Sequence, residues 1–181
     1  MSMHIFFSHG KESGPNGIKI QQLSALLRER GLTSESLDYT DTFDPAVRAA
    51  RLVSRVRAFT DTNPGAGWAL AGSSMGGAVS LLALRDLQPA LKPAGLFLMA
   101  PAVFMPGYET EPLPEISCPV SLIHGWQDEI IPPENAIRFA RLFPKHTRLM
   151  LLPSGHTLNE VLPDVKHFFL RFLDDVCPGR S

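Results

Sequence analysis

Cysteine is scarce in this sequence: two of its 181 residues, Cys118 and Cys177, are cysteines. They lie far apart and form no Cys-X-X-Cys or Cys/His spacing of the kind that binds zinc, so the sequence predicts no metal site. One disulfide is possible, but a chain of this length buries about 70% of its unfolded surface and needs no crosslink. A structural disulfide and a reduced cytosolic pair of thiols therefore both remain open.

An excess of charge of either sign is also missing. The chain has 17 Lys and Arg against 18 Asp and Glu, which gives a net charge of −1 with neutral histidine. This balance does not indicate a nucleic-acid partner or binding to an anionic membrane. A local exception is a group of arginines on a helix that we expect after Pro45: Arg48, Arg51, Arg55 and Arg57. We predict that they form a solvated helix face rather than a phosphate-binding stripe.

Long hydrophobic runs are absent as well. No segment approaches the roughly 20 apolar residues of a transmembrane helix. The apolar stretch near the N-terminus, Ile5–Phe7, is too short for the hydrophobic part of a signal peptide. We therefore expect a soluble, cytoplasmic protein that does not bind a membrane.

Hydrophobic patterning predicts strands and helices that alternate along the chain. The expected strands cover residues 3–8, 33–39, 68–71, 94–100, 119–123 and 148–152. The expected helices cover residues 18–30, 45–63, the segment after Gly77, 134–143 and 165–176. Several strands are unbroken apolar runs, which is typical of a parallel sheet covered by helices on both faces. We expect one α/β domain over residues 1–181, without a cap domain, because the irregular segment from Pro101 to Pro119 is too short to form one.

The chemistry is centred on residues 68–77, which read Trp-Ala-Leu-Ala-Gly-Ser-Ser-Met-Gly-Gly. The first four residues predict a buried strand, and the glycines predict a tight turn. The residues after the glycines predict a helix. From Gly72 to Gly76 the turn matches Gly-X-Ser-X-Gly in one register, with Ser74 at its centre. The two glycines remove side chains that would collide where strand and helix cross. The hydroxyl of Ser74 is then exposed as a nucleophile, and the amide of Met75 points to where an oxyanion would form.

A glycine-rich turn that binds phosphate is the alternative to a nucleophile at this position. However, no Gly-Lys-Ser or Gly-Lys-Thr follows the glycines, and the Gly-X-Gly-X-X-Gly spacing of a dinucleotide site is absent. The strand, turn and helix around Ser74 favour the nucleophile.

A serine nucleophile needs a histidine base and a carboxylate, which follow it along the chain in the order acid, then histidine. Asp128 lies in the loop after the fifth predicted strand, and His156 lies in the loop after the sixth. We predict that they are the acid and the base. For Asp128 the alternative is a helix N-cap or a surface carboxylate, with Glu129 and Glu134 nearby. The competing histidines are His4, His9, His124, His146 and His167.

His9-Gly10-Lys11 follows the first predicted strand and completes the candidate site. Gly10 lets the backbone approach closely, and the amide of Lys11 is the predicted second oxyanion donor. We assign His9 and Gly10 to substrate binding, with a structural role as the alternative for His9. The ammonium of Lys11 is either solvated or attracts an anionic substrate.

Four motifs fall in order along nearly the whole chain, and together they resemble the α/β-hydrolase superfamily: His9-Gly10, Gly72-Ser-Ser-Met-Gly76, His124-Gly-Trp-Gln-Asp128 and Gly155-His156. The resemblance is closest to small capless bacterial serine esterases, including those similar to dienelactone hydrolase and the YqiA-like esterases. It implies hydrolysis of carboxylic esters, sometimes thioesters, through an acyl-enzyme, without a cofactor. By motif, Ser74 is then the nucleophile, His156 the base and later the acid, and Asp128 the orienting carboxylate.

The sequence departs from the fuller family pattern because it begins almost directly with the strand that carries His9-Gly10. We therefore expect a reduced, mostly parallel sheet of about six strands. The open site suits small or exposed acyl groups, and the partner we expect is a small-molecule ester or thioester. A thioesterase or amidase with the same residues, or a non-catalytic ligand-binding protein on the same fold, is the alternative.

Overall fold

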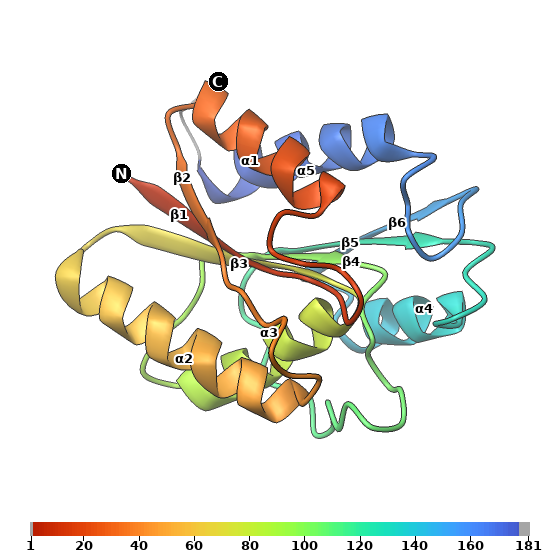
Figure 1. Cartoon of the computed structure of the whole chain (residues 1–181), viewed down its shortest axis with the longest axis horizontal. Coiled ribbons are helices and arrows are strands. Elements are labelled where there is room, and N and C mark those ends of the chain that lie inside the picture. The colour runs from red at the N-terminus through yellow and green to blue at the C-terminus, as the bar shows by residue number, and fades with distance from the viewer. Residues whose placement is uncertain (1, 178–181) are drawn as a thin grey trace.

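The computed structural model describes residues 2–177, in which six strands and five helices follow one another in the predicted order (Figure 1). The strands are β1 (Met3–Ser8), β2 (Thr33–Ser36), β3 (Gly67–Ser73), β4 (Leu96–Met99), β5 (Val120–Gly125) and β6 (Thr147–Leu152). The helices are α1 (Ile18–Glu29), α2 (Pro45–Thr62), α3 (Met75–Leu87), α4 (Pro133–Leu142) and α5 (Leu162–Val176). Among these described helices, none is both long enough and apolar enough to cross a membrane.

The strands form one sheet in the order β2-β1-β3-β4-β5-β6, and every neighbouring pair is parallel. Helices α1 and α5 cover one face, and α2, α3 and α4 cover the other (Figure 1). Successive side chains of a strand point to opposite faces, so Ile5 and Phe7 pack under α1 and α5 while Phe6 packs under α2 and α3. This two-sided burial explains the unbroken apolar runs.

The strand order reverses at β1. From β1 the chain passes through α1 to β2 on one side, and then through α2 to β3 on the other side. In open parallel sheets ligands bind beyond the carboxyl ends of the strands at such a reversal. The register aligns Ser8 with Gly72, so the loop that begins at His9 and the turn that contains Ser74 leave the sheet side by side.

The second strand is shorter than its predicted range of 33–39. After Ser36 the chain turns over the carboxyl end of β1, where the amide of Tyr39 donates to the ring of His9 instead of to a strand carbonyl. The hydroxyl of Tyr39 lies 3.3 Å from that of Ser8, and its side chain is fully buried. These contacts end the ladder between β1 and β2.

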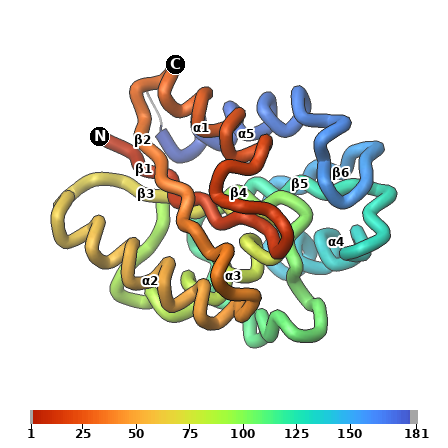
Figure 2. The backbone as a smooth tube through the Cα atoms, viewed as in Figure 1, coloured from red at the N-terminus to blue at the C-terminus, as the bar shows by residue number. Residues whose placement is uncertain are grey.

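The connection between β4 and β5 forms neither helix nor strand over residues 100–119. Figure 2 shows it as an irregular loop beside α3 and α4. Several of its side chains, including Val103 and Ile116, pack into the core on that face of the sheet. The segment therefore covers the edge of the core and builds no cap.

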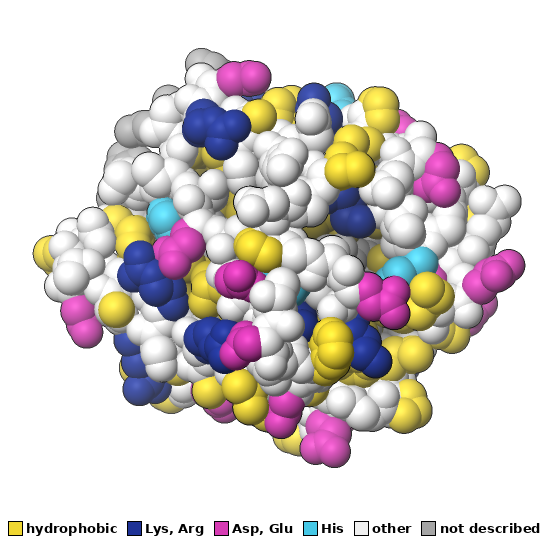
Figure 3. Space-filling view, viewed as in Figure 1, with side chains coloured by type: hydrophobic (Ala, Val, Ile, Leu, Met, Phe, Trp, Pro, Cys, Tyr) yellow, Lys and Arg dark blue, Asp and Glu magenta, His cyan; other side chains and the backbone are white. Residues whose placement is uncertain are grey.

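The prediction of a solvated arginine face on α2 is wrong for Arg48, which is fully buried. Arg55 is exposed and Arg51 is half-buried, and both pair with acidic side chains, so the surface in Figure 3 shows basic and acidic groups interspersed over α2. Arg48 lies one helical turn before Leu52 and two before Val56, both of which are buried. Helical spacing therefore places it in the apolar stripe of the helix despite its charge.

The thiol of Cys118 is buried and free, so the structural disulfide that the sequence left open is not formed. Burial raises its pKa to about 11. The thiol is therefore protonated and unreactive near neutral pH.

Buried histidines make the stability of the fold depend on pH. Burial lowers the pKa of His4, His9 and His124 below the ordinary value of 6.5. Below pH 6.5 the unfolded chain binds protons that the folded chain does not, so the free energy of unfolding is greatest above that pH and falls as the solution is acidified. Each such proton contributes at most about 1.4 kcal/mol per pH unit. His4 stacks on Phe59 with its ring nitrogen Nε2 unpartnered.

We therefore expect His4→Phe to weaken this pH dependence. Urea unfolding of wild type and variant at pH 7.5 and pH 5.5 measures the effect. An equal loss of stability in both proteins on acidification would contradict the prediction that His4 contributes to this pH dependence.

Candidate active site

The turn around Ser74 has the strained geometry that the motif requires. Ser74 is the N-cap residue of α3, with φ 55° and ψ −120°, a conformation that residues with side chains rarely adopt. A Cβ atom on Gly72 would lie 2.3 Å from the carbonyl oxygen of Gly76, and one on Gly76 would lie 1.9 Å from that of Ser8. Both distances are far inside van der Waals contact. The two glycines are therefore what allows strand, turn and helix to pass so closely.

The structure brings Ser74, His156 and Asp128 together at the carboxyl edge of the sheet. Nε2 of His156 lies 2.9 Å from the Oγ atom of Ser74, and Nδ1 lies 2.8 Å from Oδ2 of Asp128. The three residues come from the turn after β3 and the loops after β5 and β6. The side chain of His156 is 17% exposed, whereas that of Asp128 is completely buried. The arrangement is therefore partly open to solvent at Ser74 and His156 and closed at the acid.

Asp128 accepts hydrogen bonds from three N–H groups and lies beside a fourth. Its Oδ1 accepts from the amides of Ile130 and Ile131 at 2.9 and 2.8 Å. Its Oδ2 receives Nδ1 of His156, and Nε2 of His124 lies 3.1 Å from the same oxygen. Burial lowers the pKa of His124, which favours the neutral ring. Nε2 faces two acceptors, the carbonyl oxygen of Ile131 and Oδ2 of Asp128, so this nitrogen carries the proton. The sequence contains no signal that predicts this second imidazole beside the acid.

The competing candidates lie elsewhere. Glu129 and Glu134 are exposed, and so are His146 and His167. Of the histidines in the described chain, His156 alone hydrogen-bonds to Ser74. Within residues 2–177 no three His, Cys, Asp or Glu side chains are placed to hold a metal ion.

Comparison with solved structures identifies the family. A protein described as a hydrolase of the alpha/beta superfamily, from Xanthomonas campestris pv. campestris, is 31% identical to this chain and superposes with a TM-score of 0.81. The match covers 94% of this chain and 98% of that one. The chain belongs to the α/β hydrolase superfamily. A scan against protein-family models and a search of curated proteins found no match.

More distant structures share the fold of this α/β hydrolase. A Coxiella burnetii protein described as an alpha-beta serine hydrolase homologue is 21% identical, with a TM-score of 0.80 over 96% of this chain and 86% of its own. A Xanthomonas campestris serine hydrolase described as having no lid is 19% identical, with a TM-score of 0.79 over 98% and 84%. The expectation of a reduced α/β-hydrolase fold without a cap is thus confirmed, with a sheet that is parallel throughout.

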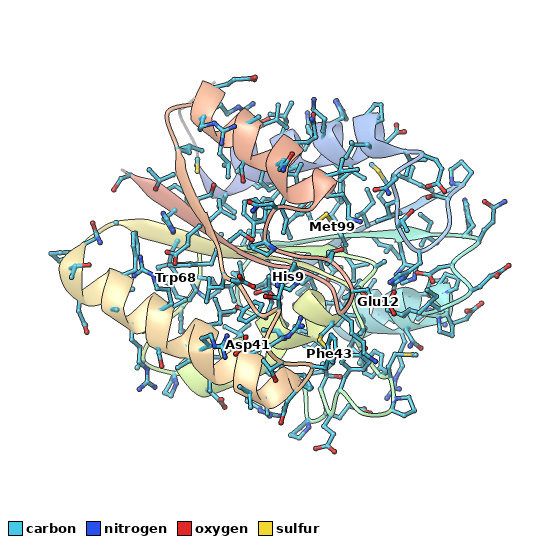
Figure 4. The ribbon with its side chains drawn as sticks, in the orientation of Figure 1. His9, Glu12, Asp41, Phe43, Trp68 and Met99 are labelled. Carbon is cyan, nitrogen blue, oxygen red and sulfur yellow. The ribbon has the colours of Figure 1, made fainter. Side chains whose placement is uncertain are left out.

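The imidazole of His9 is tied to its own loop. Its Nε2 accepts the amide hydrogen of Tyr39 at 3.1 Å, so the other ring nitrogen carries the proton and donates it to the carbonyl of Gly10 at 2.8 Å. The ring is buried near the segment that carries Asp41 and Phe43 (Figure 4). These bonds support the structural alternative for His9. A substrate contact at Gly10 stays a prediction.

The two predicted oxyanion donors are the amides of Met75, which follows Ser74 in the chain, and of Lys11, which follows Gly10. Met75 is the first residue of α3, so its amide has no acceptor within the helix. Gly10 lies against the turn, because a Cβ atom there would be 3.5 Å from that of Ser74. The Gly10–Lys11 peptide follows this contact directly, and the role of the Lys11 amide stays a prediction. The ammonium of Lys11 lies 5.6 Å from the ring centroid of Phe43, on the side of the β2–α2 segment.

A cavity of about 190 Å³ adjoins the site between the β1–α1 loop and the loop after β6. Its lining includes Ser13, Lys19, Ser73 and Thr157, so it touches the neighbours of both Ser74 and His156 in the chain. The ammonium of Lys19 donates to the carbonyl of Thr157 and links the two loops. Desolvation lowers the pKa of Lys19. The space is small and partly polar.

Proposed function

We propose that this α/β hydrolase is a serine hydrolase that cleaves carboxylic esters of small or exposed acyl groups through an acyl-enzyme on Ser74. The observation that carries the proposal is the unbroken chain of hydrogen bonds from Asp128 through His156 to Ser74, at 2.8 and 2.9 Å. Each bond has the length of a catalytic contact in a nucleophile–base–acid arrangement.

The geometry supports a division of roles. The carboxylate of Asp128 accepts the Nδ1 proton of His156, which leaves the lone pair on Nε2 directed at the hydroxyl of Ser74. As the Ser74 oxygen attacks the substrate carbonyl, Nε2 takes the hydroxyl proton, and it then gives that proton to the departing alcohol. Water repeats the sequence on the acyl-enzyme. The amides of Met75 and Lys11 are the proposed donors to the oxyanion of each tetrahedral intermediate.

The size of the substrate follows from the surroundings of the serine. The adjoining cavity holds about 190 Å³, and residues 100–119 build no cap domain. A long acyl chain would therefore leave most of its apolar surface in water and gain little binding free energy. We infer a preference for short acyl groups.

An acyl-chain series tests this proposal. With p-nitrophenyl acetate, butyrate, octanoate and palmitate, we expect hydrolysis by the wild-type protein, with kcat/KM highest for the shortest chains. Matched thioesters and anilides decide between esterase, thioesterase and amidase. Absence of turnover on every ester by a folded protein would reject the proposal and favour a ligand-binding role.

A further inference from the structure

Arg48 makes unusual contacts for a buried residue of α2. Its guanidinium is completely buried, yet it points at backbone rather than at a carboxylate. It donates to the carbonyl oxygens of Thr42, Gly10, Tyr39 and His9, at 2.8, 3.2, 3.1 and 3.5 Å. Arg48 therefore connects the crossover helix α2 to both ends of the β2–α2 segment and to the loop that follows β1.

These contacts are not explained by packing alone. Burying a cation without a carboxylate partner is costly, and an apolar side chain of similar volume commonly gives equal or greater stability at such a position. The neighbouring positions of the same helical stripe, Leu52 and Val56, are apolar. Among residues 2–177, Arg48 forms no ion pair. The nearest pair along α2 joins Arg51 to Asp41, and the guanidinium of Arg48 bonds to carbonyl groups instead. What the guanidinium provides, and an apolar side chain cannot, is a fixed direction for those carbonyls.

The carbonyl of Gly10 is the one that matters for the site. It accepts from Nδ1 of His9 at 2.8 Å and from Nη1 of Arg48 at 3.2 Å. The peptide between Gly10 and Lys11 is trans, since the cis peptides of the described chain precede Pro89 and Pro112. The N–H of a trans peptide points opposite to its C=O. The amide of Lys11 is therefore turned away from Arg48 and His9, on a loop that lies against Ser74.

We propose that Arg48 is a positioning residue that, together with His9, clamps the Gly10 carbonyl and so aims the Lys11 amide at the oxyanion. This inference rests on the proposed function and names a residue on which its chemistry depends. An amide fixed before the substrate arrives needs no reorganisation during the reaction, and it stabilises the transition state more than the ground state. Its loss should lower kcat and leave KM nearly unchanged.

The test compares Arg48→Met, Arg48→Lys and His9→Phe with the control Arg51→Met, which removes a partly exposed arginine from the same helix. Esterase assays give kcat and KM separately, and circular dichroism melts show that each variant is folded. Removing one oxyanion donor costs about 10²- to 10³-fold in kcat, so we expect a loss of at least about 10-fold for Arg48→Met, with KM unchanged. Lysine keeps the charge but has no planar fork of donors, so Arg48→Lys should recover only part of the rate.

His9→Phe keeps a buried ring and removes one donor to Gly10 while Arg48 stays in place. It should show the same loss of kcat, which keeps the proposal testable if Arg48→Met fails to fold. Folded variants that retain the wild-type kcat, or that change KM alone, would overturn it. Failure of the proposed function looks different, because the wild-type protein itself would then hydrolyse no ester.

Discussion

Replacing Ser74 with alanine is expected to lower kcat/KM for ester hydrolysis by roughly 10⁴-fold or more, because nucleophile and base act as one unit. The fold should be unaffected. Ser74 is the N-cap of α3, but its side chain makes no capping hydrogen bond, and its hydroxyl contacts His156 instead. Kinetic assays and thermal unfolding of the same preparations measure both effects.

Ser73→Ala is the matched control, because Ser73 is the other serine of the turn. Its side chain lines the cavity and leaves the nucleophile in place. The control should keep its reactivity toward active-site reagents, although its substrate preference can change. Equal losses in both variants would show that the turn, and not the Ser74 hydroxyl, limits the reaction.

Gly76→Ala should be among the most destabilising single substitutions in the chain. The added Cβ would lie 1.9 Å from the carbonyl oxygen and 2.4 Å from the carbonyl carbon of Ser8. These are backbone atoms of β1, which is paired on both sides, so no side-chain rotation relieves the overlap. We expect a loss above about 4 kcal/mol, or no folded protein, as for other severe overpacking in a core.

Gly14→Ala serves as the control for this substitution. The nearest atom to a Cβ there is 3.8 Å away, in the side chain of Thr40, which is ordinary contact. Its stability in urea should match that of the wild type. A Gly76→Ala protein of wild-type stability would mean that the close crossing of α3 over β1 is not as the structure shows it.

The parts of this protein that local pattern dictates were predictable from the sequence. Apolar runs and segments with helical spacing predicted the order of strands and helices. The spacing of Gly72, Ser74 and Gly76 predicted the strained turn. Asp128 and His156 could be singled out because each follows a strand whose carboxyl end must lie at the same edge of the sheet. The structure brings these side chains within hydrogen-bonding distance, while their catalytic roles stay predictions.

The network behind the site was not predictable in the same way. Charge suggested that Arg48 faces water, although its spacing with Leu52 and Val56 placed it on the buried stripe of α2. The helical spacing therefore indicated a buried position for Arg48, but its charge favoured the prediction of a solvated side chain. In contrast, the bonds that His9 and His124 make depend on how loops fold over the ends of the strands. No local sequence pattern predicts which backbone group each ring nitrogen will bond.

Covalent labelling with a fluorophosphonate probe tests the central claim most directly. Wild type and Ser74→Ala are treated in parallel, read by intact mass and then mapped by peptide digestion. We expect a single adduct on the wild-type protein, located on Ser74, and none on the variant. A folded wild-type protein that takes up no probe, or an adduct that persists in Ser74→Ala, would contradict it.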